Sequence, residues 1–208
     1  MIGVAAVLIL AASAAMVFVK RDDAEPRQDA ALERQLVLTR EHSPTLGNPS
    51  AKVHIVEFLD PACGTCALFY PIVKEWMAEV PGDIRLTVRH VGFHDGADYA
   101  VRILEASRNQ NKYWQTLEAL LASQAEWVEH HVVQPDKIGP ILSGVGLDMA
   151  QLKTDMKSVE VLQRIEIDKK DSILLKIKAT PEYFVNGQPL PSFGVQQLAD
   201  LVRVELQK

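Results

Sequence analysis

Cysteine is scarce in this sequence. Its 208 residues include only two cysteines, Cys63 and Cys66, which are too few for the disulfide framework that holds small secreted domains together. Because 48% of the residues are hydrophobic, a chain of this length can bury a core large enough to fold without such crosslinks. The two cysteines are therefore either a reactive pair or half of a metal site.

Clusters of basic residues are also missing. The net charge is −5, and no run of Lys and Arg stands out that could neutralise the phosphates of a nucleic acid. We find no internal repeat, and aromatic and aliphatic residues are spread along the chain, which excludes a disordered or collagen-like protein. We expect one domain with an insertion and no nucleic-acid partner.

The N-terminal segment, residues 1–19, is strongly apolar. Residues 2–19 contain no charged side chain, and as a helix they would span roughly 27 Å, close to the thickness of a bilayer core. Residues 12–14 offer the small-residue pattern of a signal-peptide cleavage site, but no Lys or Arg precedes the apolar run. We expect an uncleaved membrane anchor rather than a cleaved signal segment. Lys20 and Arg21 follow it directly and favour, by the positive-inside rule, a cytoplasmic position for the rest of the chain.

A charged segment separates this anchor from the folded domain. Residues 20–41 are dense in charge and include Pro26, which predicts a tether. Within it, residues 35–39 form an apolar run that predicts a short edge strand. Residues 42–51 contain two prolines and a glycine, which is typical of a loop. We expect the folded domain to occupy residues 42–208.

The two cysteines lie where a predicted strand is followed by a predicted helix. Residues 53–59 are mostly apolar and β-branched, as in a strand buried on both faces. After the cysteines, apolar residues recur with a helical period. Residues 84–91 then alternate apolar with polar or basic side chains, which predicts a half-exposed strand and completes a strand–helix–strand unit.

This position favours redox chemistry. Free backbone N–H groups and the positive end of the helix dipole stabilise an anion at a helix start, so Cys63 should ionise more readily than a free thiol. A thiolate is the nucleophile of disulfide exchange. A zinc site would need two further ligands, and no second Cys-x-x-Cys or spaced His pair follows at a suitable distance. We therefore favour a thiol–disulfide oxidoreductase site and expect no metal.

The second half of the chain is mostly helical until a late hairpin. Between residues 96 and 176 the apolar spacing predicts several helices, two of them capped by Asp148 and Ser158. An insertion of this size predicts a helical subdomain that packs against the sheet and shapes the groove beside the cysteines. Residues 182–185 read as a strand, Asn186-Gly187 as a hairpin turn, and the C-terminus as an amphipathic helix.

Several of these features together resemble the thioredoxin superfamily, and within it the exported DsbA-like proteins. They are the Cys63-Gly64-Thr65-Cys66 motif, Glu57 six residues before it, Pro71 in the following helix and Thr180-Pro181 before the hairpin. Residues 112–127 are similar to the first long helices of the DsbA-type insertion. The resemblance covers residues 42–208 and implies an α/β thioredoxin fold: a central mixed β-sheet flanked by helices, with an all-helical subdomain inserted at about residues 96–176.

The resemblance also implies catalytic roles. Cys63 would attack or be attacked, and Cys66 would resolve the mixed disulfide. Glu57 would lie buried beneath the cysteines and relay a proton to or from Cys66, since a desolvated carboxyl has a raised pKa. The redox-active disulfide Cys63–Cys66 would be the only redox group, with no other cofactor.

Further residues would contact the substrate or form the rim of the site. Thr180 and Pro181 resemble the cis-proline segment that faces the cysteines and pairs with an extended substrate segment. Asp60 would lie on the rim, where it either tunes Cys63 by its charge or is merely a solvated loop acid. The remaining predicted rim residues are Gly64 and Thr65.

The function implied is that of a protein disulfide oxidoreductase acting on cysteine-containing proteins. We expect it in the periplasm or another extracytoplasmic compartment, anchored to the inner membrane, although Lys20 and Arg21 conflict with that orientation. We prefer oxidation of substrate thiols, with reoxidation by a membrane redox partner of the DsbB type. Gly64-Thr65 matches neither the Pro-His of DsbA nor the Gly-Pro of thioredoxins. Two alternatives therefore stay open: a reductase or isomerase kept reduced by a membrane donor, and a chaperone-like or metal-handling binding module.

Overall fold

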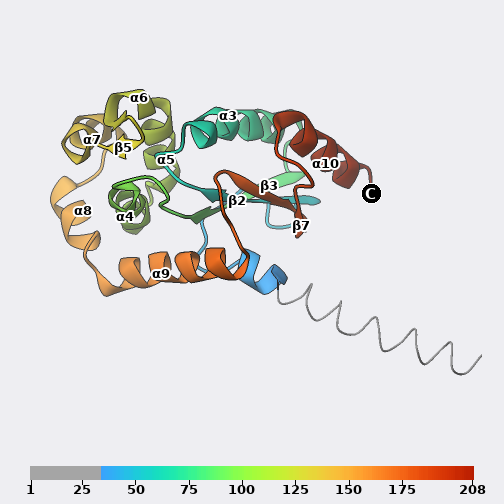
Figure 1. Ribbon diagram of the computed structural model, residues 1–208, viewed down its shortest axis with the longest axis horizontal. Helices are drawn as coiled ribbons and strands as arrows, with labels where there is room; N and C mark the ends of the chain where they lie inside the picture. Colours follow the sequence, from blue (N-terminus) through green and yellow to red (C-terminus); the bar gives the residue numbers. More distant parts are fainter. Residues whose placement is uncertain (1–33) are drawn as a thin grey trace, which may run out of the picture. The chain divides into compact units, whose positions relative to one another are not determined.

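A computed structural model describes residues 34–208 (Figure 1). The chain divides into two units, residues 1–37 and residues 38–208. The predicted anchor and most of the predicted tether lie outside the described residues. Among residues 34–208, no helix combines the length and the apolar character needed to cross a membrane.

The folded unit is built on a mixed β-sheet. Within the described residues, five strands pair in the order β1-β3-β2-β6-β7. Their bounds are Thr45–Leu46 for β1, Val53–Leu59 for β2, Ile84–His90 for β3, Glu182–Val185 for β6 and Gln188–Pro189 for β7. The central strand β2 runs parallel to β3 and antiparallel to β6. All seven of its residues are buried, as its apolar sequence predicts.

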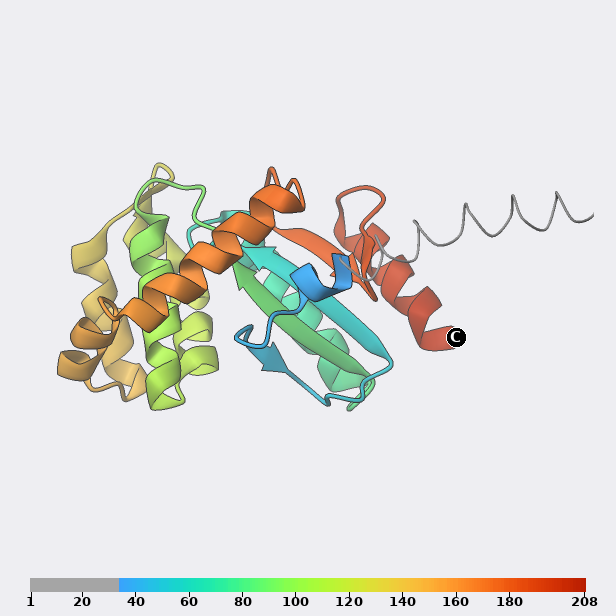
Figure 2. The same ribbon diagram turned by 90° about the horizontal axis from the view of Figure 1, so that it is seen from below.

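Helices cover both faces of this sheet. Figures 1 and 2 show α3 (Gly64–Glu79) and α10 (Val195–Gln207) on one face and α9 (Val159–Leu174) on the other. The remaining helices gather at one end of the sheet: α4 (Ala97–Ser107), α5 (Tyr113–Ala122), α6 (Gln124–Trp127), α7 (Pro135–Leu142) and α8 (Met149–Asp155). This is the predicted architecture, a mixed sheet flanked by helices with a helical insertion.

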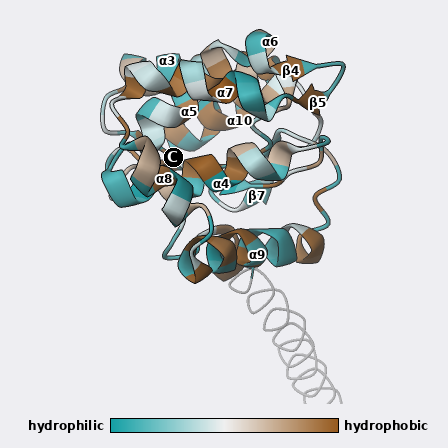
Figure 3. Cartoon of the chain, turned by 90° about the vertical axis from the view of Figure 1, so that its left-hand side faces the viewer, coloured by the Kyte–Doolittle hydropathy of each residue, from teal (hydrophilic) through white to brown (hydrophobic). Residues whose placement is uncertain are grey.

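The insertion is held together by amphipathic helices and defined caps. Figure 3 shows hydrophilic and hydrophobic residues alternating along its helices, and their apolar positions join one core with the sheet. As predicted, the Asp148 carboxylate accepts hydrogen bonds from the first N–H groups of α8, and the Ser158 hydroxyl accepts one from Val161 in α9. A small hairpin of β4 (Val128–Glu129) and β5 (Val132–Val133) follows α6.

Two predictions about strands are wrong. Residues 34–38 are helical, and the edge of the sheet is instead formed by β1, inside the predicted loop at residues 42–51. An apolar run of three residues is too short for its period to separate helix from strand. Strand β3 is not half-exposed: Thr87, Arg89 and His90 are buried. Each of these side chains has a polar partner inside the fold: Arg89 pairs with acids of α9, the Thr87 hydroxyl bonds Thr45 and His54, and the His90 ring contacts Glu105 and Tyr113.

One cluster of buried charges joins β3 to α9. The Arg89 guanidinium donates to Asp168 Oδ1 at 2.9 Å and to Asp171 Oδ2 at 2.5 Å. Arg40 donates to both carboxyl oxygens of Asp171, at 2.7 and 2.8 Å. Burial alone would raise the pKa of Asp171, but the hydrogen bonds from Arg40 and Arg89 outweigh it and lower that pKa. The pairing offsets the cost of burying these charges.

A second cluster joins β3, α4 and α9 around Glu105, which is 1% exposed. Its carboxylate contacts His90 Nδ1 at 3.1 Å and accepts from Arg108 and Arg164 at 2.8 Å each. The Tyr113 hydroxyl lies 2.9 Å from the other ring nitrogen of His90. Burial opposes ionisation, but His90 and Arg108 prevail and lower the pKa of Glu105 to about 2. The helical subdomain is thereby joined to the sheet through the contact of Glu105 in α4 with His90 in β3.

The Glu105 cluster predicts a specific loss of acid stability. Because the folded pKa lies below the ordinary value of 4.5, its stabilisation is present above pH 4.5 and disappears as the pH falls towards 2. We expect Glu105→Gln to lower the free energy of unfolding by about 3 kcal/mol at pH 7 and by much less at pH 2. Denaturant unfolding at both pH values measures this. The control is Glu166→Gln in an exposed pair with Lys170; equal effects of the two variants would contradict the account.

Candidate active site

Cys63 lies at the junction of the central strand and the first helix. Strand β2 ends at Leu59, and Cys63 is the N-cap of α3, with extended dihedral angles of −80° and 117°. Both cysteines are free thiols. Cys63 is 6% exposed and Cys66 is fully buried. The more N-terminal sulfur is therefore the one that a substrate can reach.

The surroundings of the two thiols separate their acidities. The hydrogen bond from the Cys66 thiol is the largest cause that lowers the pKa of Cys63, to about 5. Burial opposes it, while the Thr180 side chain and the backbone N–H groups of Thr65 and Cys66 add to it. Burial, together with the charges of Cys63 and Glu57, raises the pKa of Cys66 far above its ordinary value. At neutral pH, Cys63 is a thiolate and Cys66 is a protonated thiol.

Glu57 lies in the middle of β2 and is fully buried. Its cross-strand neighbour is Tyr183 of β6. Neither carboxyl oxygen of Glu57 nor the Tyr183 hydroxyl has a hydrogen-bond partner among the described residues. Burial raises the pKa of Glu57 to about 8, and the negative charge of Cys63 adds to this rise. The carboxyl is therefore mostly protonated at neutral pH and can give up or take a proton there.

The segment before β6 faces the cysteines from the opposite side. The peptide bond between Thr180 and Pro181 is cis, as the resemblance implies. In its protonated form, the Cys63 thiol donates to the Thr180 carbonyl oxygen at 3.2 Å. The fold therefore brings Glu57, Cys63 and Cys66 together with Thr180, which lies more than a hundred positions later in the sequence.

Asp60 is not a solvated acid. It is fully buried and accepts hydrogen bonds from the N–H groups of Ala62, Phe93 and His94 at 2.7–2.9 Å, and contacts His94 Nδ1 at 2.8 Å. Its side chain thus ties the loop before Cys63 to the loop after β3. This role of Asp60 could not be predicted from sequence patterns, because the partners of its carboxylate are mostly backbone groups. Gly64 is exposed and Thr65 half-buried on the rim.

Gln124 is a site residue that the sequence analysis did not single out. It lies at the start of α6, in the helical subdomain. Its side-chain Nε2 donates to the carbonyl oxygens of Pro61 at 2.8 Å and Cys63 at 3.0 Å. The sequence indicates only that Gln124 follows a predicted helix. Its role could not be predicted, because both of its partners are backbone carbonyl groups.

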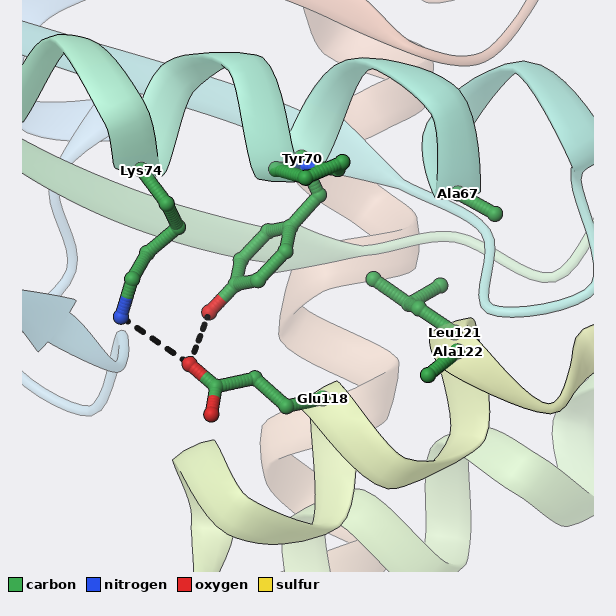
Figure 4. A pocket seen from close by; sticks show the side chains of 7 residues that line it. Ala67, Tyr70, Lys74, Glu118, Leu121 and Ala122 are labelled. Atoms are coloured by element: carbon green, nitrogen blue, oxygen red, sulfur yellow. Dashed lines mark hydrogen bonds and ion pairs between the residues drawn. The ribbon is translucent and has the colours of Figure 1, made fainter.

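The helical subdomain also forms one wall of a groove along the active-site helix. Figure 4 shows this pocket of about 310 Å³ between α3 and α5. The Lys74 ammonium and the Tyr70 hydroxyl both donate to Glu118 Oε1, at 3.0 and 3.2 Å. The other lining residues are Ala67, Pro71, Leu121 and Ala122. On another side of α3, Phe69 stacks between Tyr183 and the exposed Phe193.

The described residues also bear on the metal alternative. No group of three or more His, Cys, Asp or Glu side chains in residues 34–208 is arranged to hold a metal ion. His94 and His131 stack with ring centroids 5.7 Å apart, and the nearby Asp60 carboxylate is already engaged by four donors.

Comparisons with known proteins agree with this architecture. A family model described as Thioredoxin matches residues 39–202. A thioredoxin-like oxidoreductase from Silicibacter pomeroyi DSS-3 superposes with a TM-score of 0.71 at 29% identity, covering 83% of this chain and 98% of that one. BdbD from Bacillus subtilis superposes with a TM-score of 0.68 at 22% identity, covering 82% of this chain and 96% of that one. Wolbachia pipientis α-DsbA1 superposes with a TM-score of 0.71 at 19% identity, covering 84% of this chain and 96% of that one. The last two likenesses concern the fold alone.

Similar sequences also occur within longer proteins. The Na⁺/H⁺ antiporter NhaA of Herminiimonas arsenicoxydans is 28% identical over 144 residues, which are 69% of this chain and 22% of the antiporter. NhaA 1 of Mycolicibacterium gilvum (strain PYR-GCK) is 28% identical over 195 residues, which are 90% of this chain and 30% of that protein. The chain thus spans less than a third of the length of these relatives.

The unpartnered Glu57 carboxyl predicts a pH-dependent cost in stability. Its folded pKa of about 8 lies above the ordinary value of 4.5, so its contribution is fully favourable below pH 4.5 and is lost as the pH rises through 8. We expect the stability of Glu57→Gln relative to wild type to increase by about 5 kcal/mol between pH 4.5 and 9. Denaturant unfolding at both pH values measures the change. The exposed Glu75→Gln on α3 is the control; a pH-independent difference for Glu57→Gln would contradict the burial argument.

Proposed function

Since this chain belongs to the thioredoxin family, we propose that it is a thiol–disulfide oxidoreductase that exchanges disulfides with cysteine-containing proteins. One observation carries the proposal: Cys63, the more exposed thiol of the pair, lies at the start of α3 beside the fully buried Cys66, so that the pKa of Cys63 is lowered and that of Cys66 is raised. An attacking thiolate and a protonated resolving thiol are what exchange through a mixed disulfide requires.

The exchange proceeds in two steps in the oxidising direction. A substrate thiolate attacks Cys63 Sγ of the Cys63–Cys66 disulfide, so that a new S–S bond forms and Cys66 leaves as a thiolate. The protonated Glu57 carboxyl supplies the proton that Cys66 takes up, because burial keeps that carboxyl neutral. A second substrate thiolate then attacks the substrate sulfur of the mixed disulfide and releases the Cys63 thiolate. The substrate loses two electrons and the enzyme gains them.

The substrate segment binds opposite the cysteines. The Thr180 carbonyl oxygen lies 3.2 Å from Cys63 Sγ, and Pro181, which has no N–H group, adds no competing backbone donor to the site. An extended segment of the substrate pairs with the Thr180 backbone by strand addition, which brings its cysteine to Cys63. The rim residues Gly64 and Thr65 leave this approach open.

The preferred direction is oxidation of substrate thiols. Interactions that stabilise the Cys63 thiolate favour the reduced enzyme, and therefore make its disulfide a stronger oxidant. Turnover then requires a membrane redox partner of the DsbB type that reoxidises Cys63 and Cys66. We place the enzyme in an extracytoplasmic compartment such as the periplasm, tethered to the inner membrane by residues 1–19. Ion transport by the longer antiporter relatives is not part of this proposal.

A redox titration tests the function and its direction together. We expect the Cys63/Cys66 pair, equilibrated with glutathione, to show a potential of roughly −120 mV, whereas roughly −270 mV would indicate a reductase or isomerase kept reduced by a membrane donor. Cys63→Ser is the control and should abolish exchange with a reduced protein substrate. Full biological activity of Cys63→Ser would contradict the oxidoreductase and favour a chaperone-like or metal-handling binding module.

A further inference from the structure

The Gln124 side chain connects the helical subdomain to the loop that carries the nucleophile, residues 60–63. A side-chain amide nitrogen has two hydrogens, and Gln124 Nε2 makes two hydrogen bonds, to the carbonyl oxygens of Pro61 and Cys63 at 2.8 and 3.0 Å. Both hydrogens of this nitrogen are thus used in hydrogen bonds to the carbonyl groups on either side of Ala62.

The helix that carries Gln124 is held firmly in place. Trp127, at the other end of α6, is fully buried, and its indole nitrogen donates to the Leu120 carbonyl oxygen of α5 at 2.8 Å. The Trp127 carbonyl oxygen accepts from the N–H group of Gln134 at 2.8 Å. Gln124 therefore reaches the loop from a rigid support in the insertion.

The conformation of Cys63 depends on the carbonyl groups that Gln124 holds. The Cys63 carbonyl oxygen also accepts the first hydrogen bond of α3, from Ala67 N–H at 3.2 Å. With this carbonyl fixed, the Cys63 sulfur faces the N–H groups of Thr65 and Cys66 that stabilise its thiolate. Rotation of the peptide group that follows Cys63 would turn the carbonyl away from its donors and move the N–H groups of Thr65 and Cys66 relative to the Cys63 sulfur.

The loop is held from its other side by a different kind of group. The Asp60 carboxylate accepts the Ala62 N–H at 2.8 Å, whereas Gln124 donates to the carbonyls on either side of Ala62. An N–H group and two C=O groups of one short loop thus each have a side-chain partner. Loss of Gln124 would leave the Pro61 carbonyl without its partner and remove one of the two hydrogen bonds of the Cys63 carbonyl.

We infer that Gln124 is a positioning residue: by holding the carbonyl groups of Pro61 and Cys63, it keeps the Cys63 sulfur directed at the N–H groups that start α3. Its consequence for catalysis rests on the proposed thiol–disulfide exchange, but its effect on the Cys63 thiolate does not. The inserted subdomain then does more than line a groove, since it supplies a side chain that sets the reactivity of a residue in the sheet-and-helix core of the fold.

The test is to remove the donor while keeping the length of the side chain. In Gln124→Met we expect the pKa of Cys63 to rise by about one unit, so that the thiolate fraction at pH 5 falls about fivefold. Thiolate absorbance at 240 nm, followed against pH in the reduced protein, measures this directly. The equilibrium with glutathione should shift about tenfold towards the disulfide form of the protein at pH 7.

Two further variants separate positioning from folding. Gln124→Glu keeps the shape of the side chain but lacks the N–H donors, and should also raise the pKa of Cys63. Glu126→Gln, at an exposed position of the same helix, should leave the titration unchanged. The free energy of unfolding is measured for each variant, so that a fall in stability can be told apart from a shift in the thiolate titration.

The inference is overturned if both Gln124 variants fold and Cys63 titrates as in the wild type, whether or not stability falls, because Gln124 would then be a structural brace. Failure of the proposed function has a different signature. In that case wild-type Cys63 would titrate near pH 5 and respond to Gln124→Met, yet the protein would exchange no disulfide with reduced protein substrates.

Discussion

The stabilisation of the Cys63 thiolate at the start of α3 is the interaction on which the rest of the structure depends. It needs a helix N-terminus that points at an accessible sulfur, which the turn from β2 into α3 provides. It also needs a second thiol that stays protonated, and burial of Cys66 ensures that. The central strand, the first helix and the cis peptide segment at Thr180 are arranged around this one charge.

Three buried acids show how the fold separates structural from reactive carboxyl groups. Glu105 and Asp171 each accept hydrogen bonds from arginines, and the pKa of each is lowered. Glu57 has no hydrogen-bond partner among the described residues, and its pKa is raised. In a low-dielectric interior, a carboxyl without a cation stays neutral, whereas paired carboxylates stay charged. The ionic pairs fasten the helices to the sheet, and Glu57, the unpaired acid, is the carboxyl to which we assign proton transfer in the proposed exchange.

The sequence predicted the features that local patterns encode. The apolar run of β2, the cysteine pair before α3, the Asn186-Gly187 turn and the caps of α8 and α9 each carry a signal within a few residues. Burial of Thr87, Arg89 and His90 could not be predicted, because it depends on partners brought close by the tertiary fold. Arg89 pairs with acids nearly eighty residues away in α9, Thr87 bonds Thr45 and His54, and His90 contacts Glu105 and Tyr113. The roles of Asp60 and Gln124 were also hidden, since their hydrogen bonds are mostly to backbone groups, whose positions depend on the tertiary fold. The predicted strand at residues 35–39 is wrong because so short an apolar run is compatible with either a helix or a strand.

The central claim is that Cys63 forms the bond with the substrate and Cys66 releases it. Trapping the mixed disulfide tests this claim most directly. A Cys66→Ser variant keeps the nucleophile but cannot resolve the intermediate, so reaction with a protein carrying an accessible disulfide should accumulate a covalent complex through Cys63. The matched Cys63→Ser variant, with only the buried thiol left, should form none. A complex that forms equally through Cys66, or none with either variant, would contradict the account.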